Sequence, residues 1–216
     1  MRVTAIEKDR VLAAEVQEAL PNVRVTVGDA LTLDWRATAG AGPGEPLYVA
    51  GNIPYNITSP LIGKALTPPR PARIVFLVQA EVADRLSAEP WGPDYGALSI
   101  GVQAVARVQK LFRVPAGAFH PRPRVDSAVV RLIPLEQPLV ADGDLDSFRR
   151  MVVGIFGYRR KQLVRGLREL TGWPAVRVTG VLDSLEMPGA NRPEAVPPAG
   201  FVRLHRRLID EGWEGG

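Results

Sequence analysis

Short apolar runs and segments with helical spacing alternate along the first half of the chain. The apolar, largely β-branched runs predict strands at residues 3–6, 23–27, 47–50 and 74–78. Between them, apolar residues at intervals of three and four predict helices at residues 8–20, 57–66 and 80–87. Strands that alternate with helices indicate a parallel α/β sheet. Two later segments, residues 98–112 and 128–133, flank a proline-rich loop, and we expect them to pair as antiparallel strands.

The pattern becomes helical after the proline-rich residues 134–138. Apolar side chains follow one helical face at Phe148, Met151, Val152, Ile155 and Phe156. Similar stripes at residues 163–170 and 201–208 predict further helices. The chain is therefore predicted to contain an α/β domain over residues 1–136 and a small all-α domain over residues 137–216.

The first predicted strand is apolar along its whole length, which is typical of a strand covered on both faces. Such a strand normally has a neighbour on each side, and a parallel neighbour requires its own crossover helix. The sequence holds no such unit before residue 3. We therefore expect one strand of the sheet to be missing from the front of this chain.

Composition excludes several kinds of site. The 216 residues contain no cysteine and two histidines, so disulfides, thiolate metal sites and a cysteine nucleophile are excluded and a histidine metal cluster is not expected. No apolar stretch is long enough to span a membrane, and the charged N-terminus does not resemble a signal peptide. We expect a cytoplasmic monomer that has neither a metal nor a membrane partner.

The net charge of +4 is carried by the C-terminal third of the chain. Residues 149–168 contain seven cationic side chains and no acidic one. Such a run can be a solvated helix face, but its arginine-rich spacing favours a surface that binds phosphates. His205 lies among three arginines, and we expect it to be solvated or to face nucleic acid.

Acidic side chains follow the first two predicted strands. Glu7 ends the first strand, and Asp29 follows the second. Each has an ordinary structural interpretation, a helix N-terminal acid for Glu7 and a turn with Gly28 for Asp29. In nucleotide-binding α/β folds, however, ligands bind at the carboxyl ends of the strands, where Glu7 could accept from ribose hydroxyls and Asp29 from an adenine amine.

The tetrapeptide Asn52-Ile53-Pro54-Tyr55 follows the third strand directly. An aromatic amine is a poor nucleophile because its lone pair is delocalised into the ring. The side-chain oxygen of Asn52 and the carbonyl of Ile53 could hold the amine hydrogens and free that lone pair for attack on a methyl sulfonium. Pro54 stiffens the turn, and Tyr55 offers a face on which a flipped base stacks. The alternative is a simple strand-ending turn.

The loop at residues 119–127 is the companion feature. Prolines at alternate positions predict a rigid, extended loop. Phe119 would be a second stacking wall, or only a core anchor, while Arg122 and Arg124 would reach phosphates.

Together these motifs resemble the rRNA adenine N6,N6-dimethyltransferase family, in particular its small-subunit (16S) type. The resemblance rests on the segments 5–9, 28–30, 51–57, 119–130 and 156–163. It implies a class I methyltransferase sheet of the Rossmann-like type followed by a helical RNA-binding domain. It also implies dimethylation of two adjacent adenines, with the small ribosomal subunit as the partner and a role in ribosome biogenesis.

The resemblance further implies functional residues. S-adenosylmethionine is the implied cofactor, with Glu7, Lys8, Asp29, Ala30 and Asn52 as its binding residues. The implied catalytic residues are Asn52, Ile53, Pro54, Tyr55 and Phe119, and the implied RNA-binding residues are Arg122, Arg124, Arg159, Arg160 and Lys161. The family's first strand, which would be central between the strands at residues 3–6 and 47–50, and its glycine-rich loop are not found in this sequence. We therefore expect weak or absent cofactor binding and reduced or absent activity.

Other functions are weighed against this one. The large-subunit branch of the same family shares the tetrapeptide, but the segment Arg159-Arg160-Lys161 and the long helical tail disfavour it. Glutamine-amide methyltransferases of release factors use a related tetrapeptide with proline where this chain has Ile53. A non-catalytic rRNA-binding or ribosome-assembly factor is the third possibility, favoured by the missing glycine loop.

Overall fold

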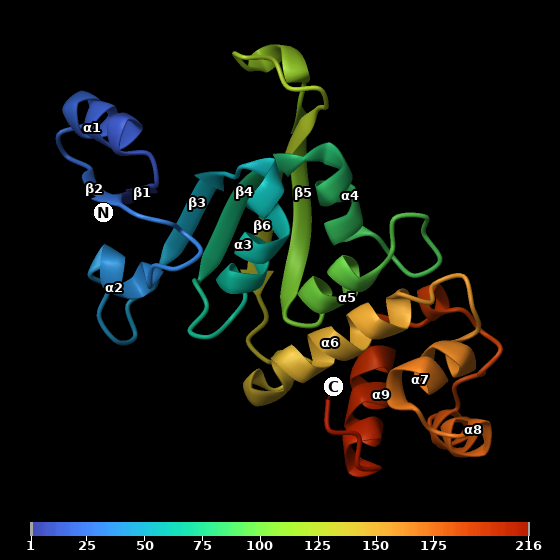
Figure 1. Cartoon of the computed structure of the whole chain (residues 1–216). Helices are drawn as coiled ribbons and strands as arrows, with labels where there is room; N and C mark the ends of the chain where they lie inside the picture. The colour runs from blue at the N-terminus through green and yellow to red at the C-terminus, as the bar shows by residue number, and fades with distance from the viewer. Residues whose placement is uncertain (1, 216) are drawn as a thin grey trace.

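The strands of the computed structural model, which describes residues 2–215, form two separate sheets. β1 (Thr4–Glu7) and β2 (Arg24–Val27) pair in parallel and are connected by α1 (Arg10–Ala19). The second sheet has the order β3-β4-β6-β5 (Figure 1), with β3 (Tyr48–Asn52), β4 (Arg73–Gln79), β5 (Ala106–Val114) and β6 (Ser127–Pro134). β3 is parallel to β4, whereas β6 is antiparallel to β4 and β5, as predicted for these last strands.

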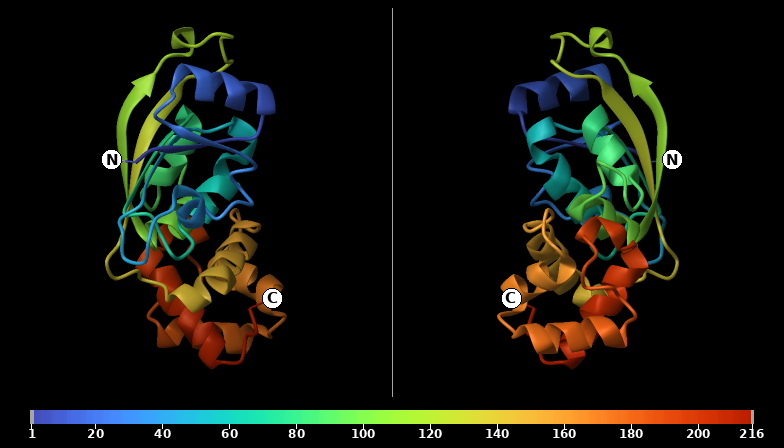
Figure 2. Two further views of the ribbon diagram at one scale, coloured as in Figure 1. Left: turned by 90° about the vertical axis from the view of Figure 1, so that its left-hand side faces the viewer. Right: turned by 90° about the vertical axis from the view of Figure 1, so that its right-hand side faces the viewer.

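Helices cover one face of the four-stranded sheet (Figure 2). They are α3 (Thr58–Ala65), α4 (Ala80–Ser87) and α5 (Ala97–Gln103). Burial alternates along β4, where Ile74, Phe76 and Val78 are no more than 1% exposed and the intervening residues are half-buried. The apolar residues 74–78 of β4 are therefore covered fully on one face only.

The predicted strand over residues 98–112 is wrong in its first part, which is α5. The helix forms because three of its side chains, those of Ser99, Ile100 and Gln103, make specific contacts. The Ser99 hydroxyl donates to the Arg85 carbonyl at 2.5 Å, Ile100 is fully buried, and Gln103 Nε2 donates to the Leu86 carbonyl at 3.0 Å. These contacts with the end of α4 override a local pattern that suits either structure.

The helical region after Pro134 consists of α6 (Leu145–Phe156), α7 (Leu163–Thr171), α8 (Ala175–Ser184) and α9 (Pro198–Asp210). Phe148, Met151 and Ile155 on α6 are fully buried, so the predicted stripe is confirmed. One buried apolar cluster continues from the sheet into these helices. Shorter elements are α2 (Trp35–Ala39) and the 3-10 turns Tyr55–Ile57, Ala116–Ala118, Asp142–Asp144 and Pro193–Ala195.

The β1-α1-β2 unit is much less buried than the rest. Every residue of β1 is half-exposed, contrary to the expectation of a strand covered on both faces. The apolar side chains predicted for α1 are in place, but Val11 is 67% exposed and Leu20 is 52% exposed. Only Ala13 of α1 is buried. The helix is thus confirmed, whereas the side chains of Val11, Leu12 and Leu20 stay exposed in the described structure.

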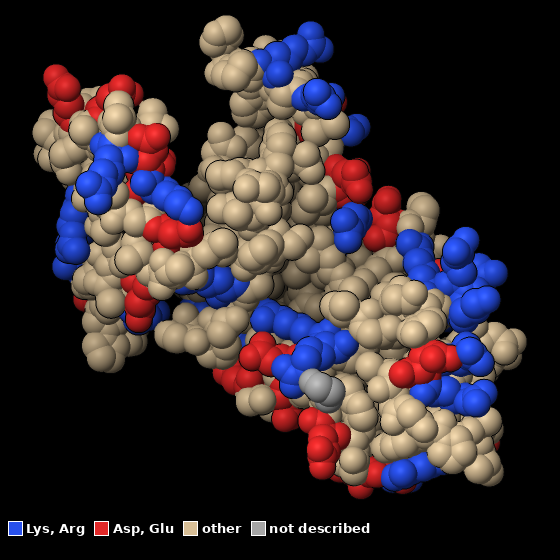
Figure 3. Space-filling model, in the orientation of Figure 1, with Lys and Arg blue, Asp and Glu red and all other residues tan. Residues whose placement is uncertain are grey.

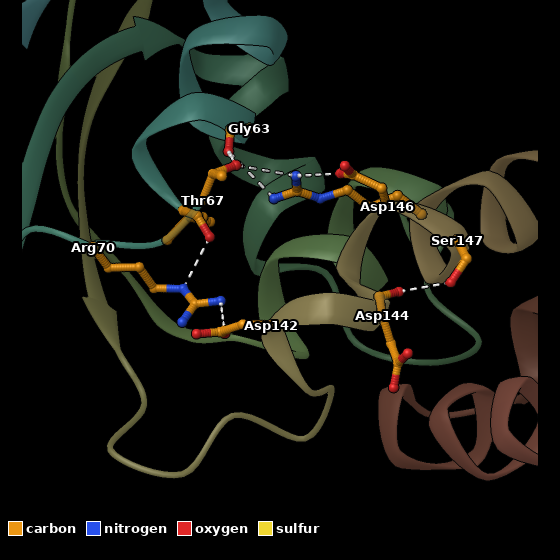
Figure 4. A network of polar contacts seen from close by, with 9 residues as sticks. Gly63, Thr67, Arg70, Asp142, Asp144, Asp146 and Ser147 are labelled. Carbon is orange, nitrogen blue, oxygen red and sulfur yellow. Dashed lines mark hydrogen bonds and ion pairs between the residues drawn. The ribbon is translucent and has the colours of Figure 1, made fainter. Parts of the chain in front are cut away.

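Polar contacts fasten α6 to the end of α3 (Figure 4). Arg70 Nη2 lies 2.7 Å from Asp142 Oδ1, and the Arg70 side chain is only 11% exposed. From α6, Arg149 Nη2 donates to the Gly63 carbonyl at 3.3 Å. Burial lowers the pKa of Arg149, Asp146 raises it and Arg70 lowers it further. Arg149 opens the basic run at residues 149–168, yet it links parts of the protein instead of facing solvent.

His205 is buried, which corrects the expectation of a solvated or nucleic-acid-facing side chain. It is 2% exposed and lies edge-on to Phe148 and to Trp213, with ring centroids 5.7 Å and 6.2 Å away. Its Nε2 shares a hydrogen bond of 2.9 Å with the Ser147 hydroxyl. Burial lowers the pKa of His205, nearby Asp144 raises it and Arg206 lowers it. The imidazole therefore belongs to the core of the helical region.

This burial predicts a loss of stability in mild acid. The unfolded imidazole titrates near a pKa of about 6.5 and the folded one below that, so the unfolded chain binds more protons between the two values. The free energy of unfolding should be highest above pH ~6.5 and fall as the pH drops below it. Thermal unfolding between about pH 7.5 and about pH 5.5 measures this. His205→Gln should flatten the difference, whereas His120→Gln, at an exposed position, should not.

Candidate functional site

A cleft of about 520 Å³ lies between the two sheets. β1 lines one side and β3 the other. Arg24 N donates to the Val3 carbonyl and Gly28 N to the Glu7 carbonyl, so alternate residues of β1 pair with β2. The backbone groups of Thr4 and Ile6 turn the opposite way. Within residues 2–215, β3 pairs only with β4, so free strand edges border the cleft on both sides.

The carboxyl end of β1 brings Glu7 beside Asp29. Glu7 Oε1 accepts from the Asp9 amide at 2.8 Å, which leaves Oε2 without a partner among the described residues. Asp29 Oδ1 accepts from the Leu31 amide at 2.8 Å, and Oδ2 pairs with Lys8 Nζ at 2.9 Å. These hydrogen bonds, first that from Lys8, lower the pKa of Asp29, and the same contact raises that of Lys8. The rim therefore carries two carboxylates, of which Asp29 is already paired.

The end of β3 places unused acceptors on the opposite side of the cleft. Asn52 is exposed, and its side-chain amide has no hydrogen-bond partner among residues 2–215. Ile53 is 5% exposed and anchors the turn in the core, while its amide donates to the Leu77 carbonyl at 3.1 Å. A Cβ on Gly51 would lie 2.9 Å from Ile53 Cδ1, so glycine leaves space for this anchor. The Ile53 carbonyl also lacks a hydrogen bond within the described part of the chain.

Tyr55 is held by its hydroxyl at the same end of the sheet. It shares a hydrogen bond of 2.9 Å with the hydroxyl of Ser127, a fully buried residue at the start of β6. The Tyr55 residue stays 36% exposed, so its ring is anchored at one end and accessible elsewhere. The Pro54 carbonyl accepts from the Ile57 amide at 3.1 Å and starts the turn into α3. No motif in the sequence predicts this contact of Ser127.

All the residues predicted to bind a cofactor line this one cleft, namely Glu7, Lys8, Asp29, Ala30 and Asn52. Trp35 lines it as well, and its Nε1 donates to the Ala30 carbonyl at 2.8 Å. Lys64 was not predicted either. Its Nζ donates to the carbonyls of Leu31 and Leu33 at 2.8 Å and 2.6 Å and lies 5.6 Å from the centroid of the Trp35 ring.

Lys64→Met should loosen the loop that carries Asp29. The substitution removes both hydrogen bonds from α3 while keeping an apolar stem, and a charge-assisted hydrogen bond contributes about 1.5–3 kcal/mol. We expect amide hydrogen exchange across residues 24–33 to become about tenfold faster or more, because local opening no longer has to break these bonds. Lys110→Met is the matched control, since Lys110 pairs with Asp84 elsewhere on the surface. Unchanged exchange in the Lys64 variant would contradict this role.

The loop after β5 projects beyond the sheets (Figure 1). Phe119 is half-buried and is not among the residues that line the cleft. Arg122 and Arg124 are exposed, and neither forms an ion pair within residues 2–215. Asp126 Oδ1 accepts from the Ala116 amide at 3.0 Å and closes the base of the loop. The structure thus places Arg122 and Arg124 in solvent, and the stacking role of Phe119 stays a prediction.

The basic run at residues 149–168 is divided between internal contacts and free surface. Protein partners engage Arg149, Arg150, Arg159 and Arg165. Arg159 Nε pairs with Glu194 Oε2 at 3.1 Å, and its Nη2 donates to the Pro93 carbonyl at 2.7 Å. Arg160 and Lys161 are exposed and unpaired within the described residues. Four of the seven cations in the run thus already have partners within the protein, and the phosphate-binding role expected of the run stays a prediction.

None of the described helices is long and apolar enough to cross a membrane. Within residues 2–215 there is also no group of three or more side chains that could ligate a metal. The cleft accordingly offers carboxylate, amide, carbonyl and aromatic groups for its chemistry.

The sequence is similar to a known protein family and to several of its members. The family model described as ribosomal RNA adenine dimethylase matches residues 1–188. A ribosomal RNA small subunit methyltransferase A of Phenylobacterium zucineum is 42% identical over 207 residues, which are 94% of this chain and 69% of that protein. The protein of the same name from Maridesulfovibrio salexigens is 36% identical over 215 residues, or 97% of this chain and 77% of that protein.

Two solved structures of methyltransferases also align with this chain. A dimethyladenosine transferase from Plasmodium falciparum aligns with a TM-score of 0.82 and 25% identity over 98% of this chain and 83% of that one. The 23S rRNA methyltransferase ErmE aligns with a TM-score of 0.67 and 29% identity over 96% of this chain and 82% of that one. The resemblance first drawn from Asn52-Ile53-Pro54-Tyr55 is thereby confirmed. The chain belongs to the ribosomal RNA adenine dimethylase family, whose members are methyltransferases of α/β fold.

Proposed function

We propose that this chain transfers methyl groups from S-adenosylmethionine to the exocyclic amines of two adjacent adenines in small-subunit rRNA. One observation carries the proposal. The unpaired acceptors of Asn52 and Ile53 line the same cleft as Glu7, so a nucleophile-preparing turn and a candidate ribose-binding carboxylate face a common space. The relatives named as small-subunit enzymes favour this substrate over large-subunit rRNA.

The reaction requires an amine lone pair directed at the methyl carbon. When bound, S-adenosylmethionine supplies an electrophilic methyl group on a sulfonium. Asn52 Oδ1 and the Ile53 carbonyl would each accept one amine hydrogen, which pulls the nitrogen toward a tetrahedral shape and frees its lone pair. Tyr55, fixed through Ser127, would stack on the extruded adenine and hold it in line. After the nitrogen is alkylated, it loses a proton to solvent, and no strong base is needed.

The cleft fits the donor at its nucleoside end. Its volume of about 520 Å³ lies in the range of small-molecule sites, which is roughly 300–1,000 Å³. Glu7 Oε2 is free for a ribose hydroxyl, and Trp35 offers an aromatic wall. The Asp29 carboxylate must first release Lys8 before it can accept from an adenine amine. Lys8 is the only cation among the described lining residues, so the methionine carboxylate has one candidate partner.

Exposed cations suit the rRNA backbone. Arg122 and Arg124 on the projecting loop, and Arg160 and Lys161 on the helical region, have no ion-pair partner in the described structure. Figure 3 shows basic side chains on this loop and over the turn between α6 and α7. Cations in such positions would hold phosphates and orient the rRNA over the Asn52 rim, without reading its sequence.

The test measures methyl transfer from labelled S-adenosylmethionine. The donor is supplied in large excess, because a cleft that is open along two strand edges should bind it weakly. Purified small ribosomal subunits that lack the modification are the substrate. We expect label in dimethyladenosine after nucleoside digestion. Large subunits and a release factor with an unmodified glutamine are the comparison substrates, because each corresponds to one of the competing enzyme functions.

The results of this assay distinguish the proposed function from the competing ones. Label in large subunits or in the release factor, without label in small subunits, would replace the proposed substrate. Salt-dependent binding to small subunits without any transfer would instead indicate a non-catalytic assembly factor. Calorimetric titration with S-adenosylmethionine completes the test, because a chain that binds no donor cannot catalyse the transfer.

A further inference from the structure

Trp91 projects from the loop between α4 and α5 into solvent. Its residue surface is 70% exposed. Its backbone has a φ of 69°, in the left-handed region that residues other than glycine rarely adopt. Both the exposed indole and this backbone conformation are unfavourable in the isolated chain. The surrounding contacts must therefore impose them.

The loop is fastened to the helical region on several sides. The Trp91 amide donates to the Glu194 carbonyl at 2.9 Å. Arg159 bridges the two segments, with Nε on Glu194 Oε2 at 3.1 Å and Nη2 on the Pro93 carbonyl at 2.7 Å. At the end of the loop, the fully buried Tyr95 donates its hydroxyl to the Val196 carbonyl at 2.8 Å. The backbone around Trp91 is thus fixed, while the indole itself takes no part in the core.

Basic side chains lie on one side of the Trp91 loop, and acidic side chains lie on the loop itself. Arg160 and Lys161 follow the bridging Arg159 directly and are exposed. The Arg192 side chain is 59% exposed and forms a long ion pair, with Nη1 3.8 Å from Glu194 Oε1. Glu89 and Asp94, which are also exposed, flank Trp91 on its own loop. In Figure 3 acidic side chains separate the basic turn between α6 and α7 from the basic projecting loop. A polyanion would therefore approach Trp91 from the side of Arg160.

We propose that Trp91 is a stacking platform for an unpaired base of the RNA substrate, whose phosphates lie over Arg160, Lys161 and Arg192. The inference rests on the proposed function and adds a contact outside the cleft. An indole face stacks on any base, and adjacent cations neutralise the phosphates on either side of it. The acidic side chains of Glu89 and Asp94 repel phosphates, which keeps the RNA backbone on the Arg160 side of the loop. Arg159 is a positioning residue, since it holds the loop instead of reaching RNA.

Affinity for small ribosomal subunits at several salt concentrations tests the proposal. Trp91→Ala should weaken binding about 5- to 100-fold without changing the slope of log affinity against log salt, because stacking releases no counterions. Trp91→Phe should recover much of the affinity. Arg160→Ala combined with Lys161→Ala should instead reduce the slope. Val176→Ala is the matched control, since Val176 is 80% exposed elsewhere on the helical region.

Tryptophan fluorescence gives an independent measurement. Of the four tryptophans, Trp213 is buried and Trp35 and Trp173 are partly buried, so iodide should quench mainly Trp91. Bound RNA should abolish that quenching. A Trp91→Ala protein that binds subunits as tightly as the wild type would overturn the inference and leave the proposed function intact. Wild-type protein that binds no RNA would overturn both, and protection by anionic vesicles but not by RNA would replace RNA with a membrane.

Discussion

Asn52→Ala should lower the single-turnover rate of methyl transfer about 10²- to 10³-fold. Removing one preorganised hydrogen-bonding group at a reacting centre has an effect of this size. The Asn52 side-chain amide has no hydrogen bond among the described residues, so the substitution breaks none, and the variant should keep its fold. The measurement uses saturating S-adenosylmethionine and small subunits, so that the rate reports the chemical step.

The controls separate chemistry from binding. Subunit affinity of the Asn52 variant should change less than about twofold, since the amide acts on the extruded base after docking. Asn22→Ala, at an exposed turn remote from the cleft, should leave the rate unchanged. A variant that retains the wild-type rate would show that Asn52 does not prepare the amine, and the assignment of the tetrapeptide would fail with it.

Among the proposed substitutions, Phe148→Ala should lower the free energy of unfolding most, by about 3–5 kcal/mol. Phe148 is fully buried on α6, where it meets the edge of His205 within the apolar cluster that joins the sheet to the helices. Truncation leaves a cavity at the junction of α6 and α9, because the surrounding helices can collapse only in part. A domain of this size should then melt about 6–20 °C lower.

Calorimetry or circular dichroism at a fixed pH measures the shift. Val153→Ala on the same helix is the control, because Val153 is 63% exposed and its loss should change the free energy of unfolding by no more than about 0.5 kcal/mol. The melting temperature of Phe148→Leu should lie between those of the two variants, since leucine fills part of the space that phenylalanine occupies. Equal melting temperatures for Phe148→Ala and Val153→Ala would contradict the central position of α6.

Local sequence signals sufficed where one physical requirement dominated. The spacing of Phe148, Met151 and Ile155 fits only a helix, and the structure has it. Asn52-Ile53-Pro54-Tyr55 was placed correctly because a strand must end where its apolar run meets a proline turn. The segment 98–112 failed because its apolar pattern suits a strand or a helix equally, and side-chain contacts with the end of α4 decided the matter.

Charged and polar side chains were harder to place from sequence. Arg149 and Arg159 were grouped with Arg160 in one basic run, yet the first two bind carbonyls and carboxylates of distant segments. His205 was expected in solvent because its neighbours in the chain are arginines. On a helix, neighbours in sequence point in different directions, so Phe148 and Trp213 enclose it instead.

By itself, the sequence determined the alternation of strands and helices, the family and the position of the tetrapeptide, because these depend on periodicity and on consecutive residues. Only the tertiary structure decided that β1 and β2 form their own sheet, that free strand edges border the cleft, and which arginines pair within the described residues. Those features depend on contacts between residues far apart in the chain. A hydrogen bond or ion pair of that kind is set by three-dimensional distance, which no local pattern encodes.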